Sequence, residues 1–234
     1  MKKEIDQFLD ELKNASPEEC IRFFVDKYAE KVIVGTSLGA EDQVLTDMIC
    51  RSGQTIAFFI LDTGRLFQET YDLLDITEQK YNIRMRLFFP DAGMVEEMVA
   101  KKGINLFYSS IENRRLCCNI RKIEPLKRAL SGMKVWITGL RKDQSVTRSN
   151  VKLVEWDETY SIIKLNPLIN WSEKQVWDYI KSNHVPYNEL HDSGNPSIGC
   201  RPCTRPILPG EETRAGRWWW ELAEYKECGL HRKE

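Results

Sequence analysis

The chain has 234 residues, of which 42% are hydrophobic and 29% charged, which suits one well-buried domain. Its formal net charge of −1 at pH 7 argues against a nucleic-acid partner. No apolar run approaches the roughly 20 residues that span a membrane, and the N-terminus lacks the apolar segment of a signal peptide, which predicts a cytoplasmic protein without a membrane partner. Seven cysteines in that reducing compartment argue against disulfides and favour ligands and a reactive thiol.

Two helices are expected at the start of the chain. Apolar residues recur at helical spacing between residues 4 and 14, and Ser16 followed by a proline is typical of a helix N-cap. Cys20 lies just inside the second helix and is interpreted as a small apolar core residue. Cys50, at the end of a later apolar helix, has the same interpretation.

A buried strand over residues 31–37 is followed by the small-residue turn Leu38–Asp42 and a helix. This arrangement places unpaired backbone N–H groups and the positive end of a helix dipole where a phosphate can bind. The turn is not a Walker A loop, because no Gly-Lys-Ser/Thr follows. Taken alone, the pattern has little specificity.

Strands are also expected at residues 56–61 and 84–89, with a helix of about 15 residues between them. Alternating strands and helices with right-handed crossovers make the strands parallel, and ligands bind at the edge where such strands end. The turns at Ser37 and at 62–65 are therefore expected at one edge. Taken alone, the 62–65 sequence is more typical of an ordinary turn with a helix cap than of a ligand-binding turn.

A helix is expected from about residue 112 to Gly132, and it contains the adjacent pair Cys117 and Cys118. Neighbouring residues on a helix are about 100° apart, so both thiolates cannot easily reach one tetrahedral zinc ion. Together with the C-x-x-C of Cys200 and Cys203, they match the four separate irons of a [4Fe–4S] cluster. The C-x-x-C alone favours zinc, and the tandem pair shifts the prediction to iron–sulfur.

A fourth strand, 134–138, leads into the cation-rich turn 139–148. Exposed cations usually form a solvated face, but a position after a buried strand equally suits ligand binding. Short strands at 153–156 and 160–165 and a helix capped by Ser172 complete the expected elements.

Beyond Cys203 the composition changes to prolines, glycines and an arginine-rich stretch beside Trp218-Trp219-Trp220, with Cys228 near the end. A few aromatic anchors are expected to hold such a segment. Arginines beside tryptophans also suit stacking with single-stranded nucleic acid, which the neutral charge balance opposes. We expect a single domain over residues 1–221 and a mobile catalytic tail over 222–234, on which a lone thiol can travel to a substrate.

These motifs together resemble the iron–sulfur branch of the adenylylsulfate (APS) and phosphoadenylylsulfate (PAPS) reductases. The resemblance covers most of the chain: the Ser37–Asp42 loop, the Leu61–Arg65 turn, the 139–145 turn, both cysteine pairs and the ending Glu227-Cys228-Gly229-Leu230-His231. PAPS-selective reductases keep the terminal motif and lack both pairs, so the pairs are highly specific. The resemblance implies an α/β fold of the PP-loop, adenine nucleotide alpha-hydrolase-like type, with helices on both faces of a mostly parallel sheet.

It also implies an oxidoreductase of sulfate assimilation and cysteine biosynthesis. The Cys228 thiolate would attack the sulfur of APS, expel AMP and become S-sulfocysteine, from which thioredoxin releases sulfite. The implied [4Fe–4S] ligands are Cys117, Cys118, Cys200 and Cys203, with a structural or electrostatic role for the cluster. The implied phosphate cradle and adenosine pocket consist of Ser37, Gly39, Asp62, Thr63, Gly64, Arg65, Gly139 and Leu140. The cations implied around the phosphosulfate are Lys122, Arg148, Arg214 and Arg217.

Three alternatives accompany this prediction. A PAPS reductase or a dual APS/PAPS reductase would use the same thiol chemistry. An adenylating PP-loop enzyme, such as a tRNA-thiolating one, shares the loop and can carry a cluster, but it does not explain the ending at residues 227–231. The third alternative is a non-catalytic zinc module that binds nucleic acid. Such a module would be colourless, whereas the iron–sulfur reductase would be brown. The sequence is also compatible with a homo-oligomer.

Overall fold

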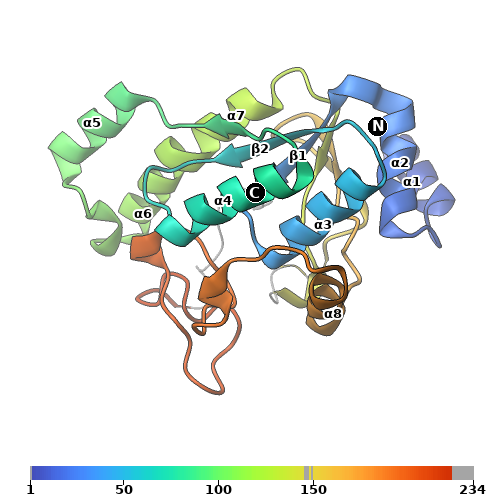
Figure 1. The fold of residues 1–234 in the computed structure, drawn as a ribbon. Helices are drawn as coiled ribbons and strands as arrows, with labels where there is room; N and C mark the ends of the chain where they lie inside the picture. Colours follow the sequence, from blue (N-terminus) through green and yellow to red (C-terminus); the bar gives the residue numbers. More distant parts are fainter. Residues whose placement is uncertain (1, 145–147, 149, 223–234) are drawn as a thin grey trace. The chain divides into compact units, whose positions relative to one another are not determined.

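The structure is a computed structural model that describes residues 2–144, 148 and 150–222. A six-stranded sheet with the order β3-β2-β1-β4-β6-β5 organises the fold (Figure 1). The pairs β1–β2, β1–β4 and β4–β6 are parallel, and β5–β6 is antiparallel. The predicted mostly parallel α/β fold is confirmed.

By its contacts the chain divides into two compact units. Unit 1 consists of Met1–Ile60, Asp72–Arg86 and Leu130–Asn188, and unit 2 of Leu61–Tyr71, Leu87–Ala129 and Glu189–Glu234. The single domain expected over residues 1–221 stays a prediction. No helix within the described residues has the length and apolar character that a membrane crossing requires.

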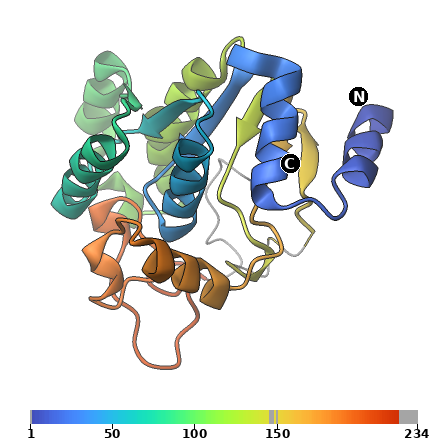
Figure 2. The ribbon, with the colours of Figure 1, turned by 45° about the vertical axis from the view of Figure 1, so that its right-hand side comes forward.

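Unit 1 contains most of the sheet. Its strands are β1 (Val32–Thr36), β2 (Ala57–Leu61, whose last residue belongs to unit 2), β4 (Val135–Ile137), β5 (Val154–Asp157) and β6 (Ile162–Leu165). Its helices are α1 (Lys2–Glu11), α2 (Pro17–Tyr28), α3 (Ala40–Arg51), most of α4 (Gln68–Tyr81) and α8 (Glu173–Asn183). α2 packs against β1 and α3, α1 packs against β5, and α3 packs against α8 (Figure 2).

The helix starts of unit 1 follow the predicted capping residues. The Ser16 hydroxyl accepts a hydrogen bond from Glu19 N at 3.2 Å, and the Glu19 carboxylate accepts one from Ser16 N at 2.7 Å. This capping box satisfies two of the backbone donors that a helix start leaves unpaired. Ser172 caps α8 in the same way.

The core of unit 1 confirms the interpretation of two cysteines. Cys20 is 1% exposed within the main hydrophobic cluster, and Cys50 packs against that cluster. Gly35 in β1 has a steric role, since a Cβ there would lie 2.6 Å from Trp136 Nε1 and 2.9 Å from the Phe59 ring. The sheet therefore needs a glycine where these two rings approach the backbone.

Unit 2 contains the remaining elements: β3 (Arg86–Phe88, whose first residue belongs to unit 1), α5 (Ala92–Lys102), α6 (Ile111–Cys118), a π-helical turn (Asn119–Ile123) and α7 (Glu124–Leu130, whose last residue belongs to unit 1). The helical run from α6 to α7 matches the helix expected over 112–132. Helix α5 was not expected from the sequence, although Val95, Met98 and Val99 recur in it at helical spacing and belong to one hydrophobic cluster. Asp91 caps α5 by accepting a hydrogen bond from Met94 N at 2.9 Å.

Candidate functional site

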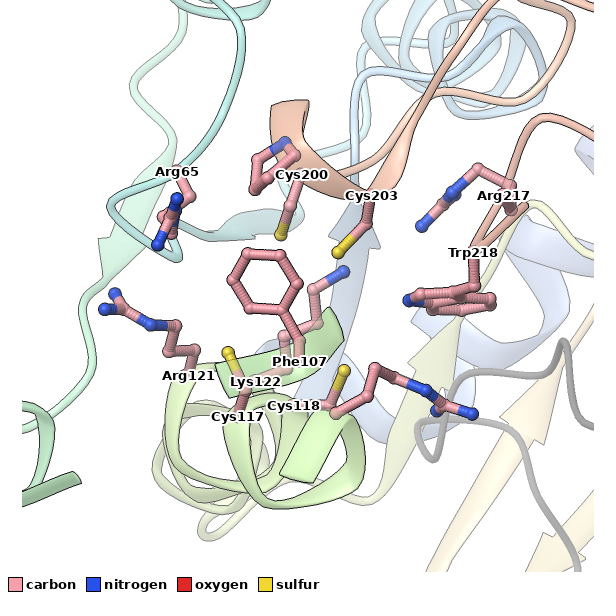
Figure 3. Close-up of a pocket in the computed structure, with 12 residues that line it drawn as sticks. Arg65, Phe107, Cys117, Cys118, Arg121, Lys122, Cys200, Cys203, Arg217 and Trp218 are labelled. Atoms are coloured by element: carbon pink, nitrogen blue, oxygen red, sulfur yellow. The ribbon is translucent and has the colours of Figure 1, made fainter. Parts of the chain in front are cut away.

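A pocket in unit 2 brings the four predicted cluster cysteines together (Figure 3). It encloses about 400 Å³, part of it open to solvent. The sulfurs of Cys117 and Cys118 point into it from one side, and those of Cys200 and Cys203 from the other (Figure 3). The other lining residues are Arg65, Phe107, Arg114, Arg121, Lys122, Pro202, Arg217 and Trp218.

The first cysteine pair occupies the last turn of α6. Ser110 caps this helix, since its hydroxyl accepts a hydrogen bond from Asn113 N at 3.1 Å. The π-helical turn follows directly and contributes Arg121 and Lys122 to the pocket lining. A π-helical turn inside a helix is uncommon and often occurs at functional sites. Here it places two cations beside two thiols.

The second pair flanks a short 3-10 helix, Arg201–Cys203, in which Cys200 is the N-cap residue and Cys203 is the last residue. Cys203 N donates to Cys200 O at 2.9 Å, and Arg201 N donates to the carbonyl of Arg65 at 2.8 Å. The Thr204 hydroxyl accepts from Gly199 N at 3.1 Å and donates to Cys200 O at 3.1 Å. These backbone bonds set the spacing of the two sulfurs before any group binds them.

The 62–65 turn contacts both cysteine segments. Thr63 Oγ1 lies 3.3 Å from Cys200 Sγ, and Arg121 donates to the Thr63 carbonyl at 2.6 Å. The Asp62 carboxylate accepts from Gly64 N at 2.7 Å and from the Tyr71 hydroxyl at 2.9 Å. Burial, with the bond to Asp62, raises the pKa of Tyr71 to about 12. The bond from Gly64 N to the Asp62 carboxylate is an Asx turn, which is the ordinary turn expected from the sequence. Thr63 of this turn also contacts Cys200, a predicted cluster ligand.

Four arginines and one lysine line this pocket. Arg65 is held by Ile104 O at 2.7 Å and by Asn105 Oδ1 at 3.1 Å, and its guanidinium lies 5.1 Å from the Phe107 ring centroid. Arg121 and Arg217 are buried, and the Nε of each has no hydrogen-bond partner within the described residues. Buried donors of this kind suit an anionic group held in the pocket.

The thiols do not share one environment. Burial raises the pKa of Cys203 to about 12 and the pKa of Cys117 above its usual value, while Arg121 acts to lower that of Cys117. Thiols in such surroundings are protonated unless a metal binds them, and coordination removes the proton outright. The pocket therefore suits a metal group more than a reactive thiol.

The donor set can be tested against one metal ion and against a cluster. In the described part of the chain, no three or more His, Cys, Asp or Glu side chains are grouped closely enough to hold one metal ion. A four-iron cluster requires a different arrangement, because each thiolate binds a separate iron. Four thiols around one cation-lined pocket fit such a cluster, whose net charge with four thiolates is negative.

The predicted phosphate loop lies in unit 1. Ser37 donates twice to Asp42 Oδ2, from its backbone N at 2.7 Å and from its hydroxyl at 2.8 Å. Leu38 has a φ of 58°, and Gly39 is the N-cap residue of α3. Burial raises the pKa of Asp42 to about 6, against the opposing effect of the bonds from Ser37. The loop is thus closed by a carboxylate at a helix start.

The turn after β4 packs on this loop. A Cβ at Gly139 would overlap Asp42 Oδ1 and would lie 3.0 Å from Glu41 Cβ. Arg141 and Glu41 form an ion pair at 2.8 Å, and Leu140 is buried. Arg148 is also buried and donates to Gln144 Oε1. The turns after β1 and β4 therefore pack against each other within unit 1.

The predicted substrate residues therefore fall into two groups. Unit 1 contains Ser37, Gly39, Gly139, Leu140 and Arg148, and unit 2 contains Asp62, Thr63, Gly64, Arg65, Lys122, Arg214 and Arg217. Of the second group, Arg65, Lys122 and Arg217 line the cysteine pocket, and Arg214 does not. Cys228 and the predicted tail from residue 223 onward lie outside the described residues.

Sequence reasoning missed five residues of the pocket, which are Phe107, Arg114, Arg121, Pro202 and Trp218. Arg114 precedes Cys118 by four residues, so helical spacing places the two on one face of α6 and could have identified it. Phe107 and Trp218 carry no such signal, because an apolar ring that covers a pocket resembles any core residue.

Fold and site together define a class, namely mostly parallel α/β proteins with a cysteine-lined, cation-rich pocket. The chain belongs to the phosphoadenosine phosphosulfate reductase domain family, whose model matches residues 31–206. A curated relative from Allochromatium vinosum, an adenosine 5'-phosphosulfate reductase, is 51% identical over 205 residues, which cover 88% of this chain and 80% of the relative. The chloroplastic 5'-adenylylsulfate reductase 3 of Arabidopsis thaliana is 43% identical over 98% of this chain and 52% of its own length.

Solved structures agree with this family. The phosphoadenylyl-sulfate reductase of Candida auris, in a phosphate complex, is similar with a TM-score of 0.77 and 33% identity, covering 88% of this chain and 98% of that one. The FMN adenylyltransferase of Candida glabrata, in complex with ATP, has a TM-score of 0.57 at 15% identity, covering 88% of this chain and 65% of that one. The second similarity concerns the fold alone.

Proposed function

We propose that this protein is an oxidoreductase that reduces adenylylsulfate to sulfite and AMP in sulfate assimilation, with electrons from a dithiol protein such as thioredoxin. The observation that carries the proposal is the convergence of two cysteine pairs, 82 residues apart between Cys118 and Cys200, on one cation-rich pocket. Curated relatives named adenosine 5'-phosphosulfate reductase at 47–51% identity support the choice of substrate.

The proposed chemistry has two steps. The Cys228 thiolate attacks the sulfate sulfur, an S–S bond forms, and the bond from that sulfur to the AMP phosphate oxygen breaks with its electron pair on AMP. A thiolate of the dithiol protein then attacks Cys228 Sγ, and sulfite leaves with the electron pair of the S–S bond. The second thiol resolves the mixed disulfide, so the dithiol supplies the two electrons.

Cations have a defined role in the first step. Negative charge builds up on the departing AMP, and arginine or lysine donors fixed near it lower the barrier. We assign this role to Lys122, Arg148, Arg214 and Arg217. In unit 2, Arg217 is fixed by a bond to Ile198 O at 3.1 Å and by the Trp218 ring, 4.8 Å from its guanidinium. Ser37, Gly39, Gly139 and Leu140 in unit 1, with Asp62, Thr63, Gly64 and Arg65 in unit 2, are the proposed contacts to the nucleotide.

We further propose that Cys117, Cys118, Cys200 and Cys203 hold a [4Fe–4S] cluster. When bound, the cluster supplies a fixed centre of charge and a covalent link between two distant segments. The thiol steps balance without an electron from it. The orphaned Nε donors of Arg121 and Arg217 support an anionic group at this place.

Intact-protein mass spectrometry tests the proposed reaction. The protein is mixed with APS in the absence of any thiol, and the reaction requires a sulfonate adduct that maps to Cys228. Addition of thioredoxin should remove the adduct and release sulfite. Wild-type protein that binds APS and forms no adduct would exclude the mechanism.

A second candidate substrate is PAPS, which the similarity to the Candida auris enzyme favours. The carboxylates of Glu41 and Asp42 lie in the phosphate loop, and carboxylates near a ribose 3' position repel an added phosphate. We therefore expect kcat/KM to be higher for APS than for PAPS, and the reverse order would assign the enzyme to PAPS. A cytoplasmic location is part of the proposal, because the thiol cycle needs a reducing compartment.

A further inference from the structure

An ion pair in unit 2 has no part in the chemistry proposed above. Arg114 Nε donates to Glu221 Oε1 at 2.9 Å, and Arg114 Nη2 donates to Glu221 Oε2 at 2.8 Å. Both side chains are only 2% exposed. A bidentate pair of this kind fixes both the distance and the orientation of its two partners.

Arg114 connects this pair to the cysteine pocket. It lies four residues before Cys118 on α6 and lines the same pocket. Burial acts to lower the pKa of Arg114, but Glu221 and then Cys118 raise it, and the net shift is upward. The guanidinium therefore stays charged between a carboxylate and a predicted cluster ligand.

The segment that carries Glu221 is held beside the same helix. Trp218 is 1% exposed, and its ring lies 4.8 Å from the guanidinium carbons of Arg114 and Arg217. Glu221 N donates to Trp218 O at 2.8 Å, which closes a turn. The Trp220 ring packs 4.5 Å from that of Tyr108. The chain up to Glu221 is thus fixed by rings and by one buried carboxylate.

Glu221 is close in sequence to the proposed nucleophile. Cys228 follows it by seven residues, which span at most about 25 Å when fully extended. The position of Glu221 therefore sets the volume that the Cys228 thiol can reach. A release of Glu221 from α6 would enlarge this volume and dilute the thiol at the sulfur it must attack.

We propose that Arg114 and Glu221 are positioning residues, which fasten the origin of the Cys228 segment to the helix that carries Cys117 and Cys118. This inference rests on the proposed function, because it concerns the approach of Cys228 to the substrate. The proposal gives neither residue a contact with the reacting atoms. Their effect is to keep the thiol at a high local concentration.

The test is the rate of adduct formation on Cys228 in a single turnover with APS and no thiol, expressed per cluster-loaded protein. Glu221→Gln keeps the size of the side chain and removes its charge, and Arg114→Lys keeps the charge and removes the bidentate geometry. We expect each to slow adduct formation at least ten-fold, with AMP affinity within two-fold of wild type. The double variant should be no slower than the slower single variant, because both changes break one link.

Arg205 and Glu211 supply a matched control in the same unit. They form a bidentate pair at 2.9 and 2.8 Å, their side chains are 32% and 29% exposed, and neither is among the residues that line the pocket. Glu211→Gln should leave the adduct rate unchanged. If the buried pair has a purely structural role, Glu221→Gln should have a lower Tm but the same adduct rate per loaded protein as wild type. That result would overturn the proposal.

Two further outcomes are distinguishable. If Glu221→Gln does not fold, Glu221→Asp takes its place, and a wild-type adduct rate in that variant overturns the inference equally. If wild-type protein forms no adduct at all, the proposed function fails, and with it the premise of this inference. A slow variant beside a fast wild type supports the inference.

Discussion

Thr63 Oγ1 lies 3.3 Å from Cys200 Sγ, inside a turn that also accepts a hydrogen bond from Arg121. A threonine hydroxyl has one proton to donate, and a thiolate ligand only accepts. When Cys200 is metal-bound, the hydroxyl therefore donates to its sulfur. This contact joins the strand-end turn to both cysteine segments, and it can be tested by substitution.

Thr63→Val should weaken cluster retention. A hydrogen bond to a charged group contributes about 1.5–3 kcal/mol, so we expect iron release to a chelator to be roughly ten-fold faster or more. Thr63→Ser keeps the hydroxyl and serves as the control, with release close to wild type. Equal release rates for the valine and wild-type proteins would show that the contact has no part in holding iron.

Replacement of a pocket cysteine should remove the cluster. Cys203→Ser is expected to abolish iron content, visible absorbance and reductase activity, because a hydroxyl is a poor ligand for iron at neutral pH. Cys50→Ser is the control, since Cys50 packs against the core of unit 1 and is not among the residues that line the pocket. A Cys203→Ser protein with full iron content would refute the assigned ligand set.

Asp42 gives unit 1 a predictable dependence on pH. Its pKa is raised from 3.8 to about 6 by burial, so between these values the folded state binds more protons than the unfolded state. Stability from this group is fully present below about pH 4 and is lost as pH rises through 6. The loss amounts to roughly 3 kcal/mol at most, at 1.36 kcal/mol per pKa unit.

Asp42→Asn should therefore raise Tm relative to wild type at pH 7–8 and leave it nearly unchanged at pH 4. The asparagine oxygen can still accept the two bonds from Ser37. Thermal unfolding of both proteins between pH 4 and 8 provides the measurement. A variant that is less stable by the same amount at every pH would show that the carboxylate does not titrate in this range.

Two glycines near Asp42 separate a structural from a ligand-binding role. A Cβ at Gly139 would overlap Asp42 Oδ1 and lie 3.2 Å from Asp42 N. Gly139→Ala should lower Tm by roughly 3–10 °C, from about 1–3 kcal/mol of overpacking. A Cβ at Gly39 would meet no atom closer than 3.5 Å, and its φ of −68° suits any residue.

Gly39→Ala should therefore leave Tm within about 2 °C of wild type. If the nucleotide contacts this loop, the added methyl should weaken AMP binding at least ten-fold. Calorimetric titration with AMP decides the matter. Unchanged AMP affinity in a stable Gly39→Ala protein would remove this loop from the nucleotide site.

Local sequence rules were sufficient for much of this protein. Ser16 and Ser172 predicted their helix starts, because a cap depends on residues three apart in the chain. Buried strands such as Val32–Thr36 stand out because strands covered on both faces are continuously apolar. The two cysteine pairs predicted a shared centre from spacing and residue type alone.

Long-range packing decided the rest. Helix α5 carries an apolar stripe of Val95, Met98 and Val99, but only the folded chain shows that this stripe joins the cluster that contains Phe107 and Trp218. Thr63 and Arg121 meet across 58 residues of sequence, and Arg114 and Glu221 across 107. The energy of such pairs depends on burial and on the geometry between distant segments, which no local window contains. Residue types and spacings determined the chemistry of this chain, and only tertiary packing decided which cations and carboxylates surround it.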